Sequence, residues 1–140
     1  MPLPTHLSLE LVTPDRAIVH EQVDEVEIPG ADGYFGVLPG HTPLLAALSA
    51  GVLWYRKGTE KVYLSVAYGF AEVQPDRVTI LAQLAERAEE IDVARAEAAR
   101  KRAEQRMMTP AAEVDIERAR MALLKSLVRL QAAERARIRS

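Results

Sequence analysis

The stretch EEIDVARAEAARKR, residues 89–102, marks the point at which the chain changes from one kind of structure to another. All seven glycines and seven of the eight prolines precede residue 76, and such residues punctuate short strands with turns. The chain after residue 90 is instead rich in Ala, Glu, Arg and Leu, which favour helices. The sequence therefore predicts two units: a β-structured unit over residues 1–88 and a helical unit over residues 89–140.

Short segments before residue 88 alternate apolar and polar residues with the two-residue period of a half-buried strand. HLSLELV, residues 6–12, places Leu7, Leu9 and Leu11 on one face. Turn signals such as PGADG and QPDR separate these segments from one another. Closely spaced short strands are typical of an antiparallel β-sandwich or flattened barrel, which is the predicted fold of this unit.

Two helices are predicted after the boundary. Asp92 is in position to cap the first helix, which would run to about residue 107, and Thr109 with Pro110 would begin the second. The first helix offers mostly alanine on its inner face. Apolar residues recur at helical spacing along the second: Ile116, Leu123, Leu127 and Leu130. Small residues facing leucine allow close approach, so we expect an antiparallel two-helix hairpin.

Composition excludes several classes of function. The absence of cysteine excludes a disulfide framework, thiol catalysis and cysteine-ligated zinc, and it is typical of a reducing cytoplasm. The N-terminus shows no signal-peptide pattern and no apolar stretch approaches the roughly 20 residues that span a bilayer, so we expect no direct membrane insertion. The three histidines lack metal-ligand spacing, and neither a nucleophile motif nor a Gly-rich phosphate loop is present, so we expect no metal site and no catalytic residue.

Charge is distributed unevenly along the chain. The net charge of −2 combines six basic and thirteen acidic residues in 1–90 with twelve basic and seven acidic residues in 91–140. This asymmetry indicates two units with different partners. A nucleic-acid partner is not expected, because the aromatic residues lie outside the basic segment.

The segment IPGADGYFGVLPGHTPLLAALSAG, residues 28–51, followed by LSVAYGFAEVQPDRVTILA, residues 64–82, resembles the epsilon subunit of the F-type ATP synthase. IDVARA, residues 91–96, is similar to the nucleotide-binding signature of many bacterial members of that family. The resemblance covers essentially the whole chain. Its order of a β-sandwich followed by a helical hairpin agrees with the two predicted units.

The resemblance implies a non-catalytic rotor component of the central stalk, peripheral to the cytoplasmic face of the inner cell membrane. The sandwich would bind the gamma subunit on one side and meet the c-ring at its base, where Asp32, Tyr34 and His41 are the implied contact residues. Tyr34 stands where many members carry an acidic residue, which leaves Asp32 as the acidic group of that turn. The helices would form an arm that permits rotation when folded on the sandwich. When extended toward the alpha and beta subunits, the arm would block ATP hydrolysis.

The same resemblance implies a regulatory site for ATP, with ATP as a ligand rather than a substrate and no other cofactor. The implied residues are Glu86, Ile91, Asp92, Arg95, Ala96, Arg102, Lys125 and Arg129. Asp92, Ala96 and Glu86 would lie near the base and ribose, and the basic residues would gather the phosphates. Many members carry Arg where this chain has Lys125, and lysine keeps the charge but lacks the bidentate fork of arginine.

Simpler interpretations remain open beside this one. Asp92 and Arg95 are also what a helix cap and an i,i+3 ion pair require without any ligand. The basic residues of the second helix could be a solvated face rather than a docking surface for an acidic segment of the beta subunit. The alternative function is a freestanding β-sandwich binding module with a helical dimerisation hairpin.

Overall fold

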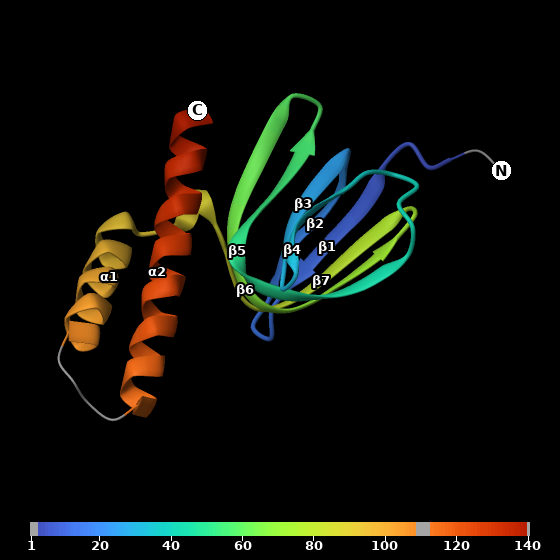
Figure 1. The fold of residues 1–140 in the computed structure, drawn as a ribbon. Helices are drawn as coiled ribbons and strands as arrows, with labels where there is room; N and C mark the ends of the chain where they lie inside the picture. The colour runs from blue at the N-terminus through green and yellow to red at the C-terminus, as the bar shows by residue number, and fades with distance from the viewer. Residues whose placement is uncertain (1–2, 109–112, 140) are drawn as a thin grey trace.

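A computed structural model describes residues 3–108 and 113–139, and shows a curved β-structure beside two helices (Figure 1). The strands are β1 Leu7–Val12, β2 Ala17–Val23, β3 Glu25–Gly30, β4 Gly33–Val37, β5 Leu44–Lys57, β6 Glu60–Gln74 and β7 Arg77–Arg87. The short 3-10 helix η1 (Ala88–Glu90) then leads into α1 (Val93–Met108) and α2 (Glu113–Arg139). The predicted sandwich followed by a two-helix hairpin is confirmed; Thr109 and Pro110 lie outside the described residues.

The seven strands pair in the order β2-β1-β7-β6-β5-β3-β4. Five of the six pairings are antiparallel, as predicted, but β1 runs parallel to β7, with Leu9 beside Val78 and Leu11 beside Ile80. A parallel pair needs a long connection, which the five intervening strands supply. This pairing joins the first strand of the sandwich to its last, and it lies beyond what local alternation can predict.

The hydrophobic core is enclosed by this curved sheet, in which the long strands β5, β6 and β7 bend (Figure 1). Leu7, Leu9 and Leu11 are fully buried in it, which confirms the predicted inner face of β1. The remaining core is also mainly aliphatic, with Ile28 and Ile80 among its fully buried side chains. Burial of so many large side chains is the main source of stability for the sandwich.

The pairing of β6 with β7 is interrupted at one point in the middle of the two strands. The pairing passes from Ala67–Leu84 to Gly69–Ala82 without a change of register, and Tyr68, at the interruption, has a φ of 62° in the left-handed region. Gly69 has a φ of 119°, and a Cβ there would lie 1.9 Å from the carbonyl oxygen of Leu81, so no other residue fits without moving the backbone. The close approach of the two strands at this point therefore depends on glycine at position 69.

Helix α2 lies between α1 and the sheet and packs on β5 and β6 (Figure 1). We call the buried cluster under it the arm interface: Val52, Trp54, Tyr63, Ala88, Ile91, Val128 and Ala132. The prediction of one apolar stripe was wrong for Leu127, which is 45% exposed. Helix α2 is covered from two sides, by α1 and by the sheet, so its buried positions are spread over two faces. None of the side chains at these positions is larger than valine: Ala119, Ser126, Val128 and Ala132. Neither described helix is long and apolar enough to cross a membrane.

Candidate functional site

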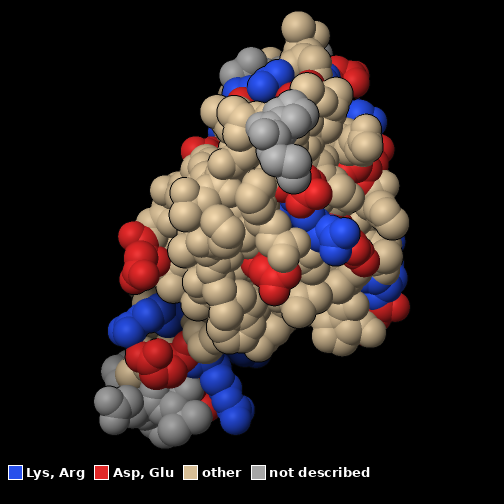
Figure 2. All heavy atoms as spheres, turned by 90° about the vertical axis from the view of Figure 1, so that its right-hand side faces the viewer, with Lys and Arg blue, Asp and Glu red and all other residues tan. Residues whose placement is uncertain are grey.

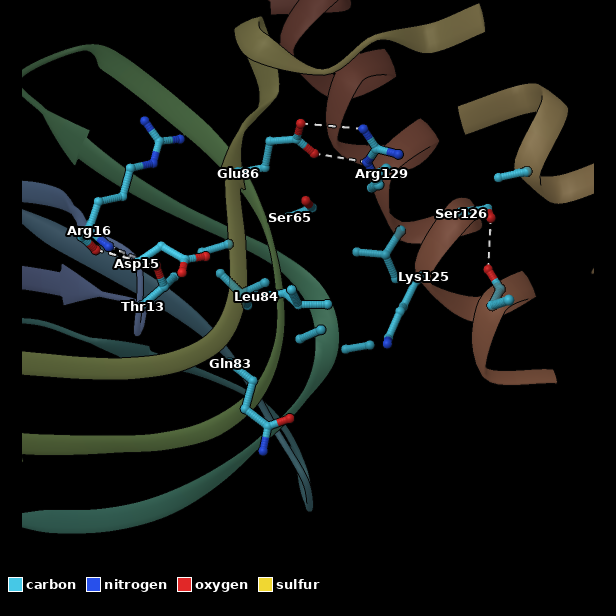
Figure 3. Close-up of a pocket in the computed structure, with 17 residues that line it drawn as sticks. Thr13, Asp15, Arg16, Ser65, Gln83, Leu84, Glu86, Lys125, Ser126 and Arg129 are labelled. Carbon is cyan, nitrogen blue, oxygen red and sulfur yellow. Dashed lines mark hydrogen bonds and ion pairs between the residues drawn. The ribbon is translucent and has the colours of Figure 1, made fainter. Parts of the chain in front are cut away.

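A hollow of about 550 Å³ lies between α2 and the sandwich (Figure 3). Its walls come from the turn between β1 and β2, from β6 and β7, and from both helices. The polar side chains that line it are Thr13, Asp15, Arg16, Ser65, Gln83, Glu86, Lys125, Ser126 and Arg129, and most of the remaining lining is alanine, valine and leucine. An apolar hollow of this size with a few polar groups is typical of small-molecule sites.

One ion pair crosses the hollow from the sandwich to the arm. Arg129 donates from Nε to Oε1 of Glu86 at 2.8 Å and from Nη2 to Oε2 at 3.3 Å, so both carboxylate oxygens accept (Figure 3). The two side chains are 27% and 29% exposed. A bidentate ion pair of this kind fixes the relative orientation of the two side chains and also attracts them through their opposite charges. Glu86 and Arg129, both predicted ligand residues, therefore bind each other directly and connect β7 to α2.

Lys125 lies one turn before Arg129 and extends along the hollow (Figure 3). Within the described part of the chain its ammonium group has no carboxylate partner, whereas Arg16 at the far wall pairs with Glu90 at 3.1 Å. The lining carries three basic and two acidic side chains, so the hollow is net positive. An unpaired ammonium in a partly apolar hollow favours an anionic ligand.

Helix α1 contributes Ala99 to the lining. Arg95 and Arg102 are four residues before and three residues after Ala99, and such positions share one face of a helix. Both arginine side chains are exposed and, among the described residues, neither forms an ion pair. They lie beside the hollow rather than in its wall, within the same helical face.

The other residues of the predicted ATP site do not line the hollow and instead take part in the fold of the helices. Asp92 caps α1, since its Oδ1 accepts a hydrogen bond from the backbone N–H of Arg95 at 3.0 Å. Ala96 is fully buried, which leaves it no surface for a ligand in this arrangement. Ile91 belongs to the arm interface and lines a different cavity, of about 700 Å³, near the end of α2. The structure thus gathers Glu86, Lys125 and Arg129, and not the whole predicted set.

Apart from Glu86, sequence reasoning missed the sandwich side of the hollow, namely Ser65, Gln83 and the β1–β2 turn. These positions are far apart in the sequence and meet only because β1, β6 and β7 are neighbours in the sheet. One signal was available: Ser65 is the polar member of the apolar run VYLSVA. A polar residue inside a strand that is buried on both faces indicates a specific contact.

The predicted contact residues lie away from the hollow, around the first half of β5. Asp32 and Tyr34 are exposed in and after the β3–β4 turn, and the hydroxyl of Tyr34 accepts a hydrogen bond from Val52 N–H at 3.0 Å. His41 is half-buried in the loop before β5, where its backbone N–H donates to the carbonyl of Leu38 at 3.1 Å. Exposed side chains on ordered turns are suited to contact with a partner.

The side of the molecule away from the helices has a broad area without charge, bordered by acidic and basic side chains (Figure 2). The sheet carries exposed large apolar side chains on adjacent strands: Leu45 of β5 is 70% exposed, Phe70 of β6 56% and Leu81 of β7 54%. Phe70 and Leu81 are direct cross-strand partners. Neighbouring exposed apolar residues of this size mark a surface that a partner covers.

Comparison with known proteins assigns both units to one family. The model of the ATP synthase delta/epsilon chain beta-sandwich domain matches residues 6–88, and that of the delta/epsilon chain long alpha-helix domain matches residues 89–134. The chain is 48% identical over 133 residues to the ATP synthase epsilon chain of Solibacter usitatus, covering 95% of this chain and 99% of the relative. It is 56% identical over 104 residues to that of Koribacter versatilis, covering 74% and 73%.

Solved structures agree with this assignment. A chain of the Euglena gracilis mitochondrial ATP synthase, in an OSCP/F1/c-ring structure, superposes with a TM-score of 0.83 at 29% identity, covering 95% of this chain and 84% of that one. A chain of the Tetrahymena thermophila mitochondrial ATP synthase central stalk and c-ring shares the fold, with a TM-score of 0.66 at 12% identity and coverage of 94% and 99%. On these matches, which extend over nearly its whole length, the chain belongs to the ATP synthase delta/epsilon chain family.

Proposed function

We propose that this chain is a non-catalytic central-stalk subunit of an F-type ATP synthase, peripheral to the cytoplasmic face of the inner membrane. In this role it connects the gamma subunit to the c-ring. The likeness of almost the whole chain to one chain of a solved F1/c-ring assembly supports the proposal, as does its identity to curated epsilon chains.

The exposed apolar surface around Leu45, Phe70 and Leu81 is the proposed contact with the gamma subunit. Its apolar side chains lie next to one another on three strands of a rigid sheet, as the buried centre of a protein interface requires. The turns that carry Asp32, Tyr34 and His41 are the proposed contact with the c-ring.

The two helices are the proposed regulatory arm. The observation that carries this proposal is that the arm interface and the sandwich core are separate clusters, so the arm can leave without opening the core. Once extended, α2 would present its basic residues to acidic surfaces of the alpha and beta subunits and stop ATP hydrolysis. Attraction of this kind is long-ranged and is screened by salt.

ATP is the proposed ligand of the hollow. The walls belong to both units, so a ligand that fills the hollow binds the docked arrangement and not the extended one. A ligand shifts a two-state equilibrium by its preference for one state. Abundant ATP would therefore keep the arm docked, and scarce ATP would release it.

Reconstitution of the ATP synthase with the full chain or with a chain ending at residue 90 tests the arm. We expect faster ATP hydrolysis with the shortened chain at low ATP concentration, and equal binding of both chains to the gamma subunit. Unchanged hydrolysis would contradict the inhibitory arm. Failure of the full chain to co-purify with a gamma subunit would contradict the stalk role itself.

Calorimetric titration of ATP into the full chain tests the ligand. We expect saturable binding that is weakened in an Arg95→Gln/Lys125→Gln variant and preserved in an Arg120→Gln control, since Arg120 pairs with Glu117 on the exposed surface of α2. Absence of binding up to several millimolar, about −3 to −4 kcal/mol of binding free energy, would leave Asp92 as a helix cap alone.

A further inference from the structure

Two serines are the only buried polar side chains of the described residues, and both line the hollow. Ser126, on α2, is 3% exposed and its hydroxyl donates to the carbonyl oxygen of Ala122 at 2.7 Å. Ser65, in the middle of β6, is 6% exposed, and its hydroxyl has no hydrogen-bond partner among the described residues. The two serines thus share a degree of burial and differ in whether the protein itself satisfies them.

The hydroxyl of Ser65 opens into the hollow. Every fully enclosed side-chain nitrogen or oxygen in the described part of the chain has a partner, so the unpartnered oxygen of Ser65 retains access to the open space. A hydroxyl that the protein does not satisfy, but that is reachable from the hollow, can donate and accept hydrogen bonds there. The partner of this hydroxyl therefore comes from what occupies the hollow.

Ser65 has Glu86 as its direct neighbour on β7, because the two residues are cross-strand partners. Cross-strand partners point to the same side of a sheet with their Cβ atoms about 5 Å apart. Figure 3 shows the Ser65 hydroxyl below the Glu86 carboxylate, whereas the ammonium group of Lys125 lies further along the hollow. A hydroxyl and a carboxylate at this separation suit adjacent hydroxyl groups of a ligand, with the cation left for its anionic part.

We propose that Ser65 is a ligand-contacting residue of the hollow that, together with Glu86, binds the ribose hydroxyls of the nucleotide. The inference rests on the proposed function, because it takes ATP as the ligand. It deepens that function by placing part of the recognition on the rigid sandwich. A nucleotide held by Ser65 of β6 and by Lys125 of α2 bridges the two units, so its affinity depends on the arm being docked.

The test compares two serine variants and two nucleotides by calorimetry on the full chain. We expect Ser65→Ala to weaken ATP binding about three- to tenfold, the value of one neutral hydrogen bond. Ser49→Ala, a control on β5 away from the hollow, should stay within about twofold, because its hydroxyl is already bonded to the backbone carbonyls of Pro29 and Gly30. With 2′,3′-dideoxy-ATP, which lacks both ribose hydroxyls, wild type and Ser65→Ala should bind equally.

Each other result overturns a defined part of the inference. Equal ATP affinity of wild type and Ser65→Ala would remove Ser65 from the site and leave ATP regulation standing. An equal loss with ATP and with the dideoxy nucleotide would overturn the ribose assignment. Absence of ATP binding by the wild-type chain would overturn the inference together with the proposed ligand.

Discussion

The sandwich core and the arm interface are built from different side chains, although they share one strand. Leu53 and Tyr55 of β5 point into the core, whereas Val52 and Trp54 of the same strand point to the arm interface. The core is filled by large aliphatic residues that are fully buried. In the arm interface, α2 contributes the buried Val128 and Ala132, with the partly buried Ala133 and Ala136 packed against the cluster.

This difference in side-chain size affects how strongly each of the two regions is stabilised. A buried methylene contributes about 0.8 kcal/mol, so an alanine stabilises far less than a leucine or isoleucine. Polar contacts at its edge also stabilise the arm interface, namely the Glu86–Arg129 ion pair and the Arg135 guanidinium 4.9 Å from the centre of the Tyr63 ring. Strand β5 therefore contributes to a large aliphatic core on one face and to a less extensively stabilised interface on the other.

The largest expected effect is the loss of stability caused by a substitution in the sandwich core. We expect Ile80→Ala to lower the free energy of unfolding by about 2–5 kcal/mol, because it leaves a cavity among fully buried side chains. Denaturant unfolding followed by far-UV circular dichroism measures this. Val128→Ala, the matched change in the arm interface, should leave the unfolding of the strands nearly unchanged. If Val128→Ala destabilised the strands as much as Ile80→Ala, the two regions would not be separate.

The next effect is on arm docking. Ala132 is fully buried against the sandwich, so Ala132→Leu should overpack the arm interface and weaken docking by about 1–3 kcal/mol. We expect faster amide hydrogen exchange throughout α2 with unchanged protection in β1 and β7. Ala98→Leu, the same change at an exposed position of α1, is the control. Loss of protection in the strands would show that arm and sandwich unfold together.

A smaller effect belongs to the ion pair between the units. A double-mutant cycle with Glu86→Gln and Arg129→Gln should give a coupling energy of about 0.5–1 kcal/mol for arm docking, falling as salt is added. Glu117 and Arg120, which pair at 2.9 Å within α2, provide a control cycle that should not affect docking. A coupling energy of zero would assign docking to the apolar contacts alone.

The smallest effect is confined to α1 and depends on pH. Hydrogen bonding to Arg100 holds the pKa of Glu97 below its ordinary value of 4.5. A lowered pKa in the folded state means that the pair stabilises α1 at pH values above 4.5 and loses this contribution as the pH falls through the lowered pKa. We expect NMR titration of Glu97 to show the shift and Arg100→Gln to remove it. An unshifted pKa in the wild-type chain would contradict the contact.

Several features of the fold could be predicted because they depend on near neighbours in the sequence. The alternation of Leu7, Leu9 and Leu11 predicted the inner face of β1, and the loss of glycine after Gly69 predicted the change to helices. Asp92 predicted the start of α1, where its side chain caps the helix. Motifs shared with a known family extended these local signals to a whole architecture, which the comparisons confirmed.

Less of the candidate site could be predicted from the sequence. Lys125 and Arg129 are one turn apart on α2, so their proximity follows from helical spacing alone. The pairing of Arg129 with Glu86 spans 43 residues and depends on how the arm docks. The burial of Ala96 and the exposure of Leu127 depend on α2 being covered from two sides.

The sequence by itself determined the strands, the helices and the boundary between them, because each depends on hydrophobic period, turn residues and caps within a few residues. The tertiary structure alone decided the parallel pairing of β1 with β7, the side of β5 that receives the arm, and the hollow that Ser65 and Lys125 line from two units. These features arise from contacts between distant segments, whose geometry is set by the packing of the whole sheet and not by any local pattern.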